Sequence, residues 1–235
     1  MTAAVTHPRA SAGRADVLAL LGLVGHLELT AFTRLAADSA LAPTLDQQLR
    51  LVHFSAGAVA RLDRVVARIT ELGGSPQVEL ARFARVLDDF DARTTPGSWW
   101  ERLLTAYVGY GVADDFCKAA AAGLDDDTRD LVMDVLDGAS HAELTVATLA
   151  AAAADDEVLT SRLALWGRRL VGEALGVVQN LLVTEPSLAR LALPAPGEPD
   201  ATAPSSDAVG DASVRLFGRL TAEHTRRMGR LGLTA

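Results

Sequence analysis

The chain has 235 residues, of which 49% are hydrophobic and 22% are charged, a composition typical of a globular protein. Its formal net charge is −8, which argues against nucleic-acid binding, because that binding depends on clustered positive charge. Cys117 is the only cysteine, so no intrachain disulfide can form and we expect a reducing, cytoplasmic location. We expect neither a signal peptide nor a membrane span, because residues 1–16 lack an apolar core and no uninterrupted apolar run is long enough.

The sequence predicts an all-α protein. Alanine and leucine are abundant and aromatic residues make up 5% of the chain, which favours helices over strands. Residues 1–13 are expected to form a flexible N-terminus, and residues 14–235 a single helical domain. Apolar periodicity between proline and glycine stops predicts six helices, over about 14–40, 45–72, 99–122, 126–154, 156–183 and 209–231.

The predicted boundaries have chemical causes. Pro43 ends the first helix, the glycine pair before Pro76 ends the second, and Ser98 can cap the third, which closes at Gly123. Residues 76–93 are expected to form a shorter helical connection with its apolar side chains turned inward: Leu80, Phe83, Val86, Leu87 and Phe90. Residues 185–208 hold five of the nine prolines and are expected to form a long mobile loop.

The connection lengths predict how the helices are arranged. Short turns after the first and third helices imply two antiparallel hairpins, and the longer 76–93 connection crosses from one hairpin to the other. This arrangement is the ferritin-like version of the four-helix bundle. The last two predicted helices would pack outside the four.

Glu28 lies within the apolar stripe of the first helix, between Val24 and Ala31. It is 15 residues before Pro43, and Ala58 is 15 residues after it. Both therefore lie ~22 Å from the turn, at one height in the bundle. Arg61 follows one helical turn later on the same face as Ala58.

Folding the third helix onto the fourth at Gly123 brings further residues to this height. Tyr110 and Gly138 become level, with Asp114 and His141 about one turn away. Ferritin-like bundles place two metals at such a level, held by one carboxylate from each of two helices and a Glu-x-x-His pair from each of the other two. Glu28 and His141 are the only two of the six ligand types that remain here, so the sequence predicts a degenerate metal site.

The chain resembles the actinobacterial ferritin-like proteins classed with tRNA 2-methylthio-isopentenyladenosine hydroxylases. The resemblance covers about 16–185 and 209–233, and rests on four stretches: LELTAF, WERLLTAYVGYGVADDF, RLALWGRRLVGEAL and LFGRLTAEHTRRMGRLGL. It implies a ferritin-like fold and an iron-dependent hydroxylation. In the family pattern the second helix carries Glu-x-x-His, the third an Asp, and the fourth an acidic residue three before its His. These ligand positions fall here on Ala58 and Arg61, Tyr110, and Gly138, which do not match the pattern.

Two functions follow. The first is a binding or scaffold protein for a protein or small-molecule partner, with no cofactor. The alternative is a non-haem di-iron or mononuclear iron hydroxylase that acts on a modified tRNA base or a small molecule, through Glu28, Asp114 and His141. Iron storage ranks lowest, because it needs ferroxidase ligands and cage assembly. An apolar helix surface leaves a homodimer open, and the sequence does not identify the partner.

The most specific prediction is that Glu28 and Arg61 meet inside the bundle. Loss of a metal would strand a buried carboxylate, and an arginine can supply the missing positive charge and bind the carboxylate bidentately. Towards the C-terminus, Glu223 and His224 are adjacent, so they point to different faces and are expected to serve surface pairing and packing.

Overall fold

The structure is a computed structural model that describes residues 12–137, 139–154, 156–193 and 206–235, without the side chains of 139–141 and 206–209. Every regular element in these ranges is helical, as the sequence predicts. The predicted flexible residues 1–11 lie outside the described part of the chain. The apolar core runs continuously from α1 to the C-terminal residues, so the described helices share one interior.

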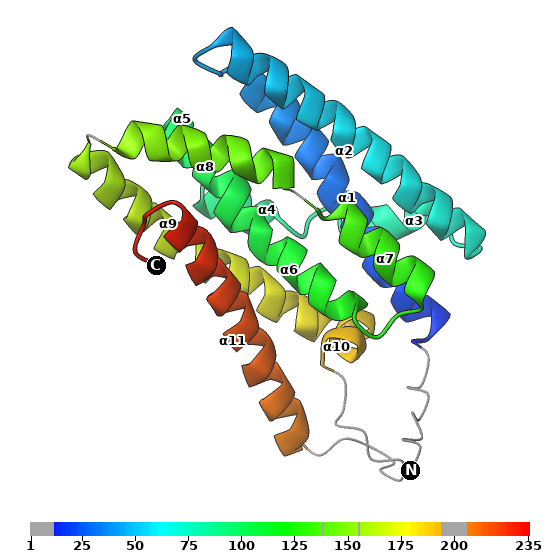
Figure 1. The fold of residues 1–235 in the computed structure, drawn as a ribbon. Coiled ribbons are helices and arrows are strands. Elements are labelled where there is room, and N and C mark those ends of the chain that lie inside the picture. Colours follow the sequence, from blue (N-terminus) through cyan, green and yellow to red (C-terminus); the bar gives the residue numbers. More distant parts are fainter. Residues whose placement is uncertain (1–11, 138, 155, 194–205) are drawn as a thin grey trace, which may run out of the picture.

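The first hairpin follows the prediction closely. Helices α1 (Arg14–Ser39) and α2 (Leu45–Glu71) lie antiparallel and side by side (Figure 1). The Thr44 side chain caps α2 by accepting a hydrogen bond from the Gln47 amide. Past α2, Gly73 adopts a φ of 72°, which a residue with a side chain rarely adopts.

Helix α1 is the most deeply buried long helix of the bundle. Leu20, Leu21 and Val24 have no exposed surface. By length and composition α1 is apolar enough to cross a membrane, but 67% of its most apolar window is buried inside the bundle. Such burial is typical of a core helix, and it is complete over residues 16–25, all of which are buried.

The third predicted helix, expected as one continuous helix over 99–122, contains a wider turn in its middle. Helix α5 (Trp99–Leu104) passes into the π-helical segment η1 (Thr105–Gly109) and then into α6 (Tyr110–Ala121). Ser98 caps α5 as expected. Gly109 has no room for a side chain, since an added Cβ would lie 2.8 Å from Phe90. The Trp166 indole donates a hydrogen bond to Thr105 Oγ1, so the π-helical turn is packed from both sides.

The fourth predicted helix, expected as one continuous helix over 126–154, is two helices in the structure, so this prediction is wrong. Helix α7 (Asp126–Val135) ends with Leu136 as its C-cap, and α8 (Ala139–Ala153) follows. The break coincides with the sequence Asp137–Gly138, two residues of low helix propensity. Gly138 itself lies outside the described residues.

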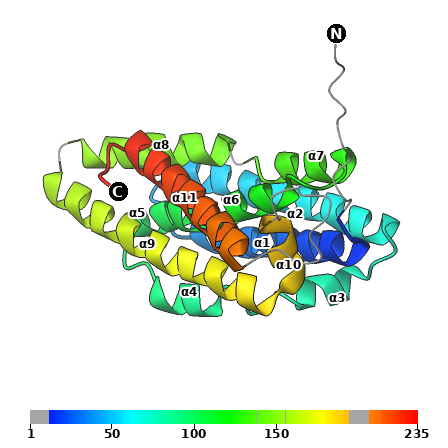
Figure 2. The same cartoon turned by 90° about the horizontal axis from the view of Figure 1, so that it is seen from below.

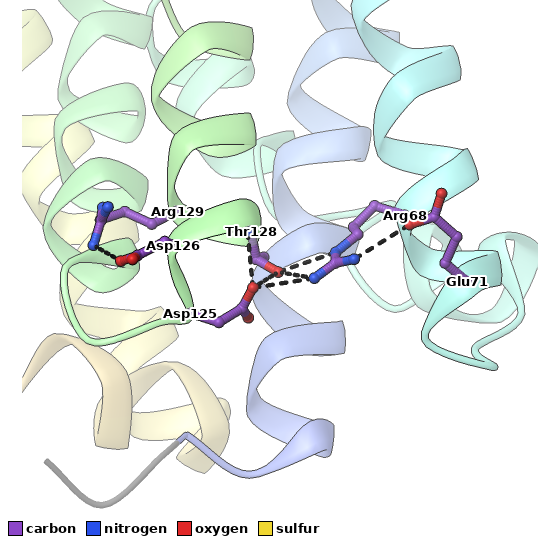
Figure 3. A network of polar contacts seen from close by, with 6 residues as sticks. All are labelled: Arg68, Glu71, Asp125, Asp126, Thr128 and Arg129. Atoms are coloured by element: carbon purple, nitrogen blue, oxygen red, sulfur yellow. Dashed lines mark hydrogen bonds and ion pairs between the residues drawn. The ribbon is translucent and has the colours of Figure 1, made fainter. Parts of the chain in front are cut away.

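A network of polar contacts joins α2 to the start of α7 (Figure 3). Asp125 caps α7 through the Thr128 amide, and Arg68 donates hydrogen bonds to Asp125 Oδ1 and Thr128 Oγ1. Burial acts to raise the pKa of Asp125, but the Thr128 hydrogen bonds and the Arg68 charge hold it below its usual value. The network therefore favours the ionised carboxylate that caps the helix.

The crossing connection contains α3 (Pro76–Ala81) and α4 (Asp88–Arg93). Its inward residues were predicted correctly: Phe83, Leu87 and Phe90 are buried, and Leu80 and Val86 are partly buried against the core. Gly22 of α1 allows α3 to approach, because an added Cβ would lie 2.5 Å from the Glu79 carbonyl oxygen.

The C-terminal helices cover one side of the bundle, with α11 lying across α6 and α9 (Figures 1 and 2). Helix α9 (Glu157–Thr184) is followed by α10 (Pro186–Ala192), and the chain ends in α11 (Ser206–Arg230). Arg227 of α11 binds both carboxylate oxygens of Asp115, at 2.6 and 2.7 Å. This ion pair holds α11 against α6.

Helix α10 corrects the predicted mobile loop at 185–208. Leu188 and Leu191 are buried, and Arg190 forms an ion pair with Asp16 of α1. Pro186 stands in the first turn of the helix, where it needs no amide partner and starts a helix rather than preventing one. The remainder of the predicted loop, 194–205, lies outside the described residues.

Candidate functional site

The site begins with Glu28, which α1 holds in the interior at 5% exposure. Arg61 reaches it from α2, with Nε 3.0 Å and Nη2 2.9 Å from Glu28 Oε2. The predicted contact of these two residues is therefore confirmed. Two details of the prediction are wrong: both nitrogens bind one oxygen, and the Arg61 side chain is 31% exposed, so the pair lies at the edge of the interior.

Small residues on α2 make room for this contact. Ala58 has no exposed surface and fills the helix interface without reaching the carboxylate. An added Cβ on Gly57 would lie 3.3 Å from Arg61 Nη1, so the guanidinium folds back over its own helix. The residues at the expected Glu-x-x-His positions thus pack and pair with neighbouring groups.

Burial controls the proton affinity of Glu28. It raises the pKa of this carboxyl group to about 7, although the hydrogen bond and charge of Arg61 act to lower it. The nearby negative charge of Asp114 raises it further. Glu28 is therefore poised near neutrality between a charged ion pair and a neutral hydrogen-bonded form.

Tyr110 lies in a second cluster. Its hydroxyl donates a 2.6 Å hydrogen bond to Asp91 Oδ1, and the Arg34 guanidinium carbon lies 3.6 Å from the ring centroid. Burial, opposed by the Arg34 charge, raises the pKa of Tyr110 to about 12. At Arg34, Nε and Nη1 are buried and form no hydrogen bond to the described residues.

Asp114 follows Tyr110 by one turn of α6. Burial raises its pKa to about 6 against the lowering effect of the positive charges of Lys118 and Arg227. Within the described residues no ion pair or hydrogen bond of its carboxylate is found, whereas its neighbour Asp115 is held by Arg227. Asp114 is close enough to Glu28 for its negative charge to raise the pKa of the Glu28 carboxyl group.

Two predicted site residues, Gly138 and His141, belong to the segment around the break between α7 and α8. Gly138 and the side chain of His141 lie outside the described residues. The backbone of His141 belongs to the first turn of α8, just after the break, rather than to the middle of a continuous helix.

These residues do not fit a di-iron centre. Glu28 is already neutralised by a guanidinium, Arg61 is permanently charged, and Ala58 offers no donor atom. Among the described side chains no three His, Cys, Asp or Glu residues are grouped so that they could hold a metal. Two cations would therefore need donors that the described side chains do not supply.

An apolar cavity adjoins the site between α1, α6 and α9. It is lined by residues such as Leu27, Phe90 and Tyr110, and its volume is about 20 Å³. A space of this size holds about one water molecule. It is too small for an organic ligand in the structure as it stands.

The sequence of residues 11–194 matches the family described as "Ferritin-like domain, actinomycetes". The chain belongs to this family. The match spans α1 to α10, which includes Glu28, Arg61, Tyr110 and Asp114, and leaves α11 outside it. No curated protein matches the chain.

The ferritin-like chain also uses residues that the sequence analysis missed. Arg34 and Asp91 flank Tyr110, and Arg227 holds Asp115. Arg34 carries one sequence signal, because Leu27, Ala31, Arg34 and Asp38 form a row at helical spacing on α1. Asp91 and Arg227 carry no local signal, because each reaches the site from a distant segment.

Proposed function

We propose that this ferritin-like protein acts as a binding or scaffold protein in which an internal ion pair takes the place of a di-iron centre. The observation that supports the proposal is the position of the Arg61 guanidinium on Glu28, at 2.9 and 3.0 Å. A permanent cation there neutralises the buried carboxylate and repels a divalent metal. The small cavity beside Tyr110 favours a partner bound at the surface over a ligand enclosed in the bundle.

The resemblance to tRNA hydroxylases then reflects common ancestry and not a shared catalysed reaction. The bundle geometry is retained, while the residues that would bind iron and activate oxygen are replaced. We place the protein in the cytoplasm, where its buried free thiol, Cys117, would stay reduced.

Metal content of the purified protein tests the proposal directly. Protein from iron-supplemented cells should carry well under one iron or manganese per chain by elemental analysis. About two metals per chain, together with substrate-dependent oxygen consumption, would instead support the hydroxylase alternative with iron bound by Glu28, Asp114 and His141. That result would overturn the proposal.

A double variant tests whether Arg61 is what prevents a divalent metal from binding at Glu28. The double change Ala58→Glu with Arg61→His restores a Glu-x-x-His pair and frees Glu28, so Co²⁺ affinity, read from visible absorption, should rise at least tenfold. Arg64→His is the matched control, because Arg64 lies on the same helix but pairs with the exposed Asp134. Equal Co²⁺ affinity of the wild type and the double variant, with both folded by circular dichroism, would show that Arg61 does not exclude the metal.

A further inference from the structure

The arginines of α11 differ from those of the other helices in how they are paired. Outside α11, each arginine in the described ranges donates a hydrogen bond, forms an ion pair or lies over an aromatic ring of the chain. On α11, Arg215, Arg219 and Arg230 form no such contact with the described residues. In a chain with a net charge of −8, unpaired positive charge gathered on one helix attracts anions to that helix.

A surface cleft between α10 and α11 adjoins two of these arginines. Its volume is about 550 Å³, which lies within the range of small-molecule sites. Arg215, Arg219 and Arg226 of α11 line it, together with Ala192 of α10. The spacing of four and seven residues places the three arginines on one face of α11. This α10–α11 cleft is therefore bounded by three guanidinium groups from a single helix face.

The other residues that line the cleft are small. They are Ala192, Ala212, Gly218 and Ala222, and an added Cβ on Gly218 would have no atom within 4 Å. Among the described lining residues there is no acidic, aromatic or large aliphatic side chain. An apolar ligand would find little surface to bury against here, so the cleft recognises its ligand mainly through charge.

Two acidic side chains of α11 lie near the cleft and leave most of its charge unbalanced. Asp211 precedes Arg215 by one helical turn, but no ion pair between them is found in the described structure. Glu223 accepts hydrogen bonds from Arg226 through both carboxylate oxygens, and these bonds hold the pKa of Glu223 below its usual value. Arg226 is thus already partly neutralised, whereas Arg215 and Arg219 keep their full charge.

We propose that the α10–α11 cleft binds a small molecule that carries a diphosphate or triphosphate group. A guanidinium group binds phosphate oxygens in a planar, bidentate geometry. Arg215 and Arg219 lie on successive helical turns, with Cβ atoms ~5–6 Å apart, so both can contact one chain of linked phosphates. With Arg226 they supply three positive charges, more than a single phosphate group with a charge of about −2 can balance.

Size and charge favour a small molecule over a nucleic acid. The three arginines occupy part of one face of one helix, and the rest of the surface belongs to a chain with a net charge of −8. A long polyanion needs positive charge spread along its backbone, and it would be repelled outside the cleft. A compact anion can enter the cleft without approaching that acidic surface.

Binding in this cleft would also fasten α11 to the rest of the bundle. Ala192 belongs to α10, which lies within the family match, whereas α11 lies outside it. Because the lining residues come from both helices, a bound phosphate chain stabilises the arrangement in which α11 is docked. The thermal midpoint should therefore rise with ligand concentration, which provides a second measurement besides affinity.

The test is calorimetric titration with inorganic pyrophosphate in metal-free buffer. The wild type should bind one pyrophosphate per chain with a Kd below ~100 μM at ~50 mM salt. The double change Arg215→Gln with Arg219→Gln should weaken binding at least ~tenfold. Both side chains are exposed, so the variant should keep the helical circular dichroism of the wild type.

Two further variants separate a site from an effect of net charge. The control, Arg50→Gln with Arg85→Gln, changes the net charge equally but removes arginines that pair with Asp46 and Asp88 outside the cleft. Its affinity should stay within ~twofold of the wild type. Glu223→Gln frees Arg226 and should raise the affinity at least ~threefold. An unchanged affinity in Glu223→Gln would overturn the assignment of Arg226 to the site.

Adenosine diphosphate distinguishes two sources of the phosphate chain. Tighter binding of adenosine diphosphate than of pyrophosphate would assign the cleft to a nucleotide, and equal binding would assign it to the phosphate chain alone. Either result supports the proposal. None of these measurements depends on the metal content of the protein, so they can fail while the metal analysis at Glu28 and Arg61 succeeds.

Three results would overturn the proposal. The first is the absence of both binding heat and a thermal shift with pyrophosphate and adenosine diphosphate at up to ~5 mM. The second is an equal loss of affinity in the Arg215→Gln, Arg219→Gln variant and in the Arg50→Gln, Arg85→Gln control. The third is binding of single-stranded RNA that the Arg215→Gln, Arg219→Gln variant loses, while neither small phosphate compound binds, because it would assign these arginines to a nucleic acid.

Discussion

Arg61 binds Glu28 through a single carboxylate oxygen. Its Nε and Nη2 atoms both approach Oε2, and Oε1 accepts no hydrogen bond from the described residues. The pair is thus weaker in geometry than a bidentate one, and its two members differ in access to water, with side-chain exposures of 31% for Arg61 and 6% for Glu28.

This difference predicts unequal effects of mutation. At pH 8, Arg61→Met should lower the unfolding free energy by ~3 kcal/mol, because it leaves a buried carboxylate without a partner. Glu28→Gln should cost less, ~1–2 kcal/mol, since the guanidinium can turn towards solvent. The double change Glu28→Leu with Arg61→Leu should recover much of the loss. Urea unfolding measures the unfolding free energy of all three variants. The control is Arg64→Met, whose unfolding free energy should stay within ~1 kcal/mol of the wild-type value. Equal losses for both single variants would contradict this account.

The pKa of Glu28 predicts a pH dependence. Because the folded-state pKa of about 7 lies above the value of the unfolded chain, the folded protein binds the extra proton as the pH falls. The wild type should therefore gain stability relative to Glu28→Gln, by ~2–3 kcal/mol between pH 8 and pH 5. The wild type should likewise gain stability relative to Asp114→Asn as the pH falls, since burial raises the pKa of Asp114 to about 6. A stability difference between wild type and Glu28→Gln that does not change with pH would refute the assignment.

His224 should lower the stability of the folded protein as the pH falls, which is opposite to the effect of Glu28. It is 2% exposed, and neither ring nitrogen has a hydrogen-bond partner in the described structure. Burial and the positive charge of Arg227 lower its pKa, so below about pH 6.5 the unfolded chain binds a proton that the folded chain refuses. His224→Leu should raise the thermal midpoint, and raise it more at pH 5.5 than at pH 8. A larger gain at pH 8 would contradict this interpretation.

Two glycines provide a matched pair of helix substitutions. Gly22→Ala places a methyl group 2.5 Å from the backbone oxygen of Glu79, so α1 and α3 must separate, and we expect a loss of ~2 kcal/mol or more. Gly176→Ala lies in α9 with no atom within 4 Å of the added group, and should stabilise the helix by up to ~1 kcal/mol. Chemical denaturation distinguishes the two. If both variants were stabilised, the close approach of α3 would be wrong.

Most helix boundaries were predictable because each has a local chemical cause. Thr44, Ser98 and Asp125 begin helices by accepting amide hydrogen bonds, and the glycines after α2 end one. The π-helical turn at Thr105–Gly109 was not predictable, because it depends on Phe90 and Trp166, which come from other segments. The short helix α10 was hidden by the high proline content around it.

The site was predictable only where counting was simple. Glu28 and Arg61 lie on two helices joined by one short turn, so their heights follow from the constant rise of a helix. The contact of Tyr110 with Arg34 and Asp91 brings together three segments, one of them beyond the crossing connection. No local pattern in the sequence records such an arrangement.

The ion pair between Glu28 and Arg61 has a consequence for how the protein matures. Where a metal supplies part of the folding free energy, a newly made chain stays incomplete until the ion arrives. Here the charge that balances the buried carboxylate is encoded in the chain and arrives during translation. The cellular abundance and half-life of this protein should therefore not change between iron starvation and iron excess.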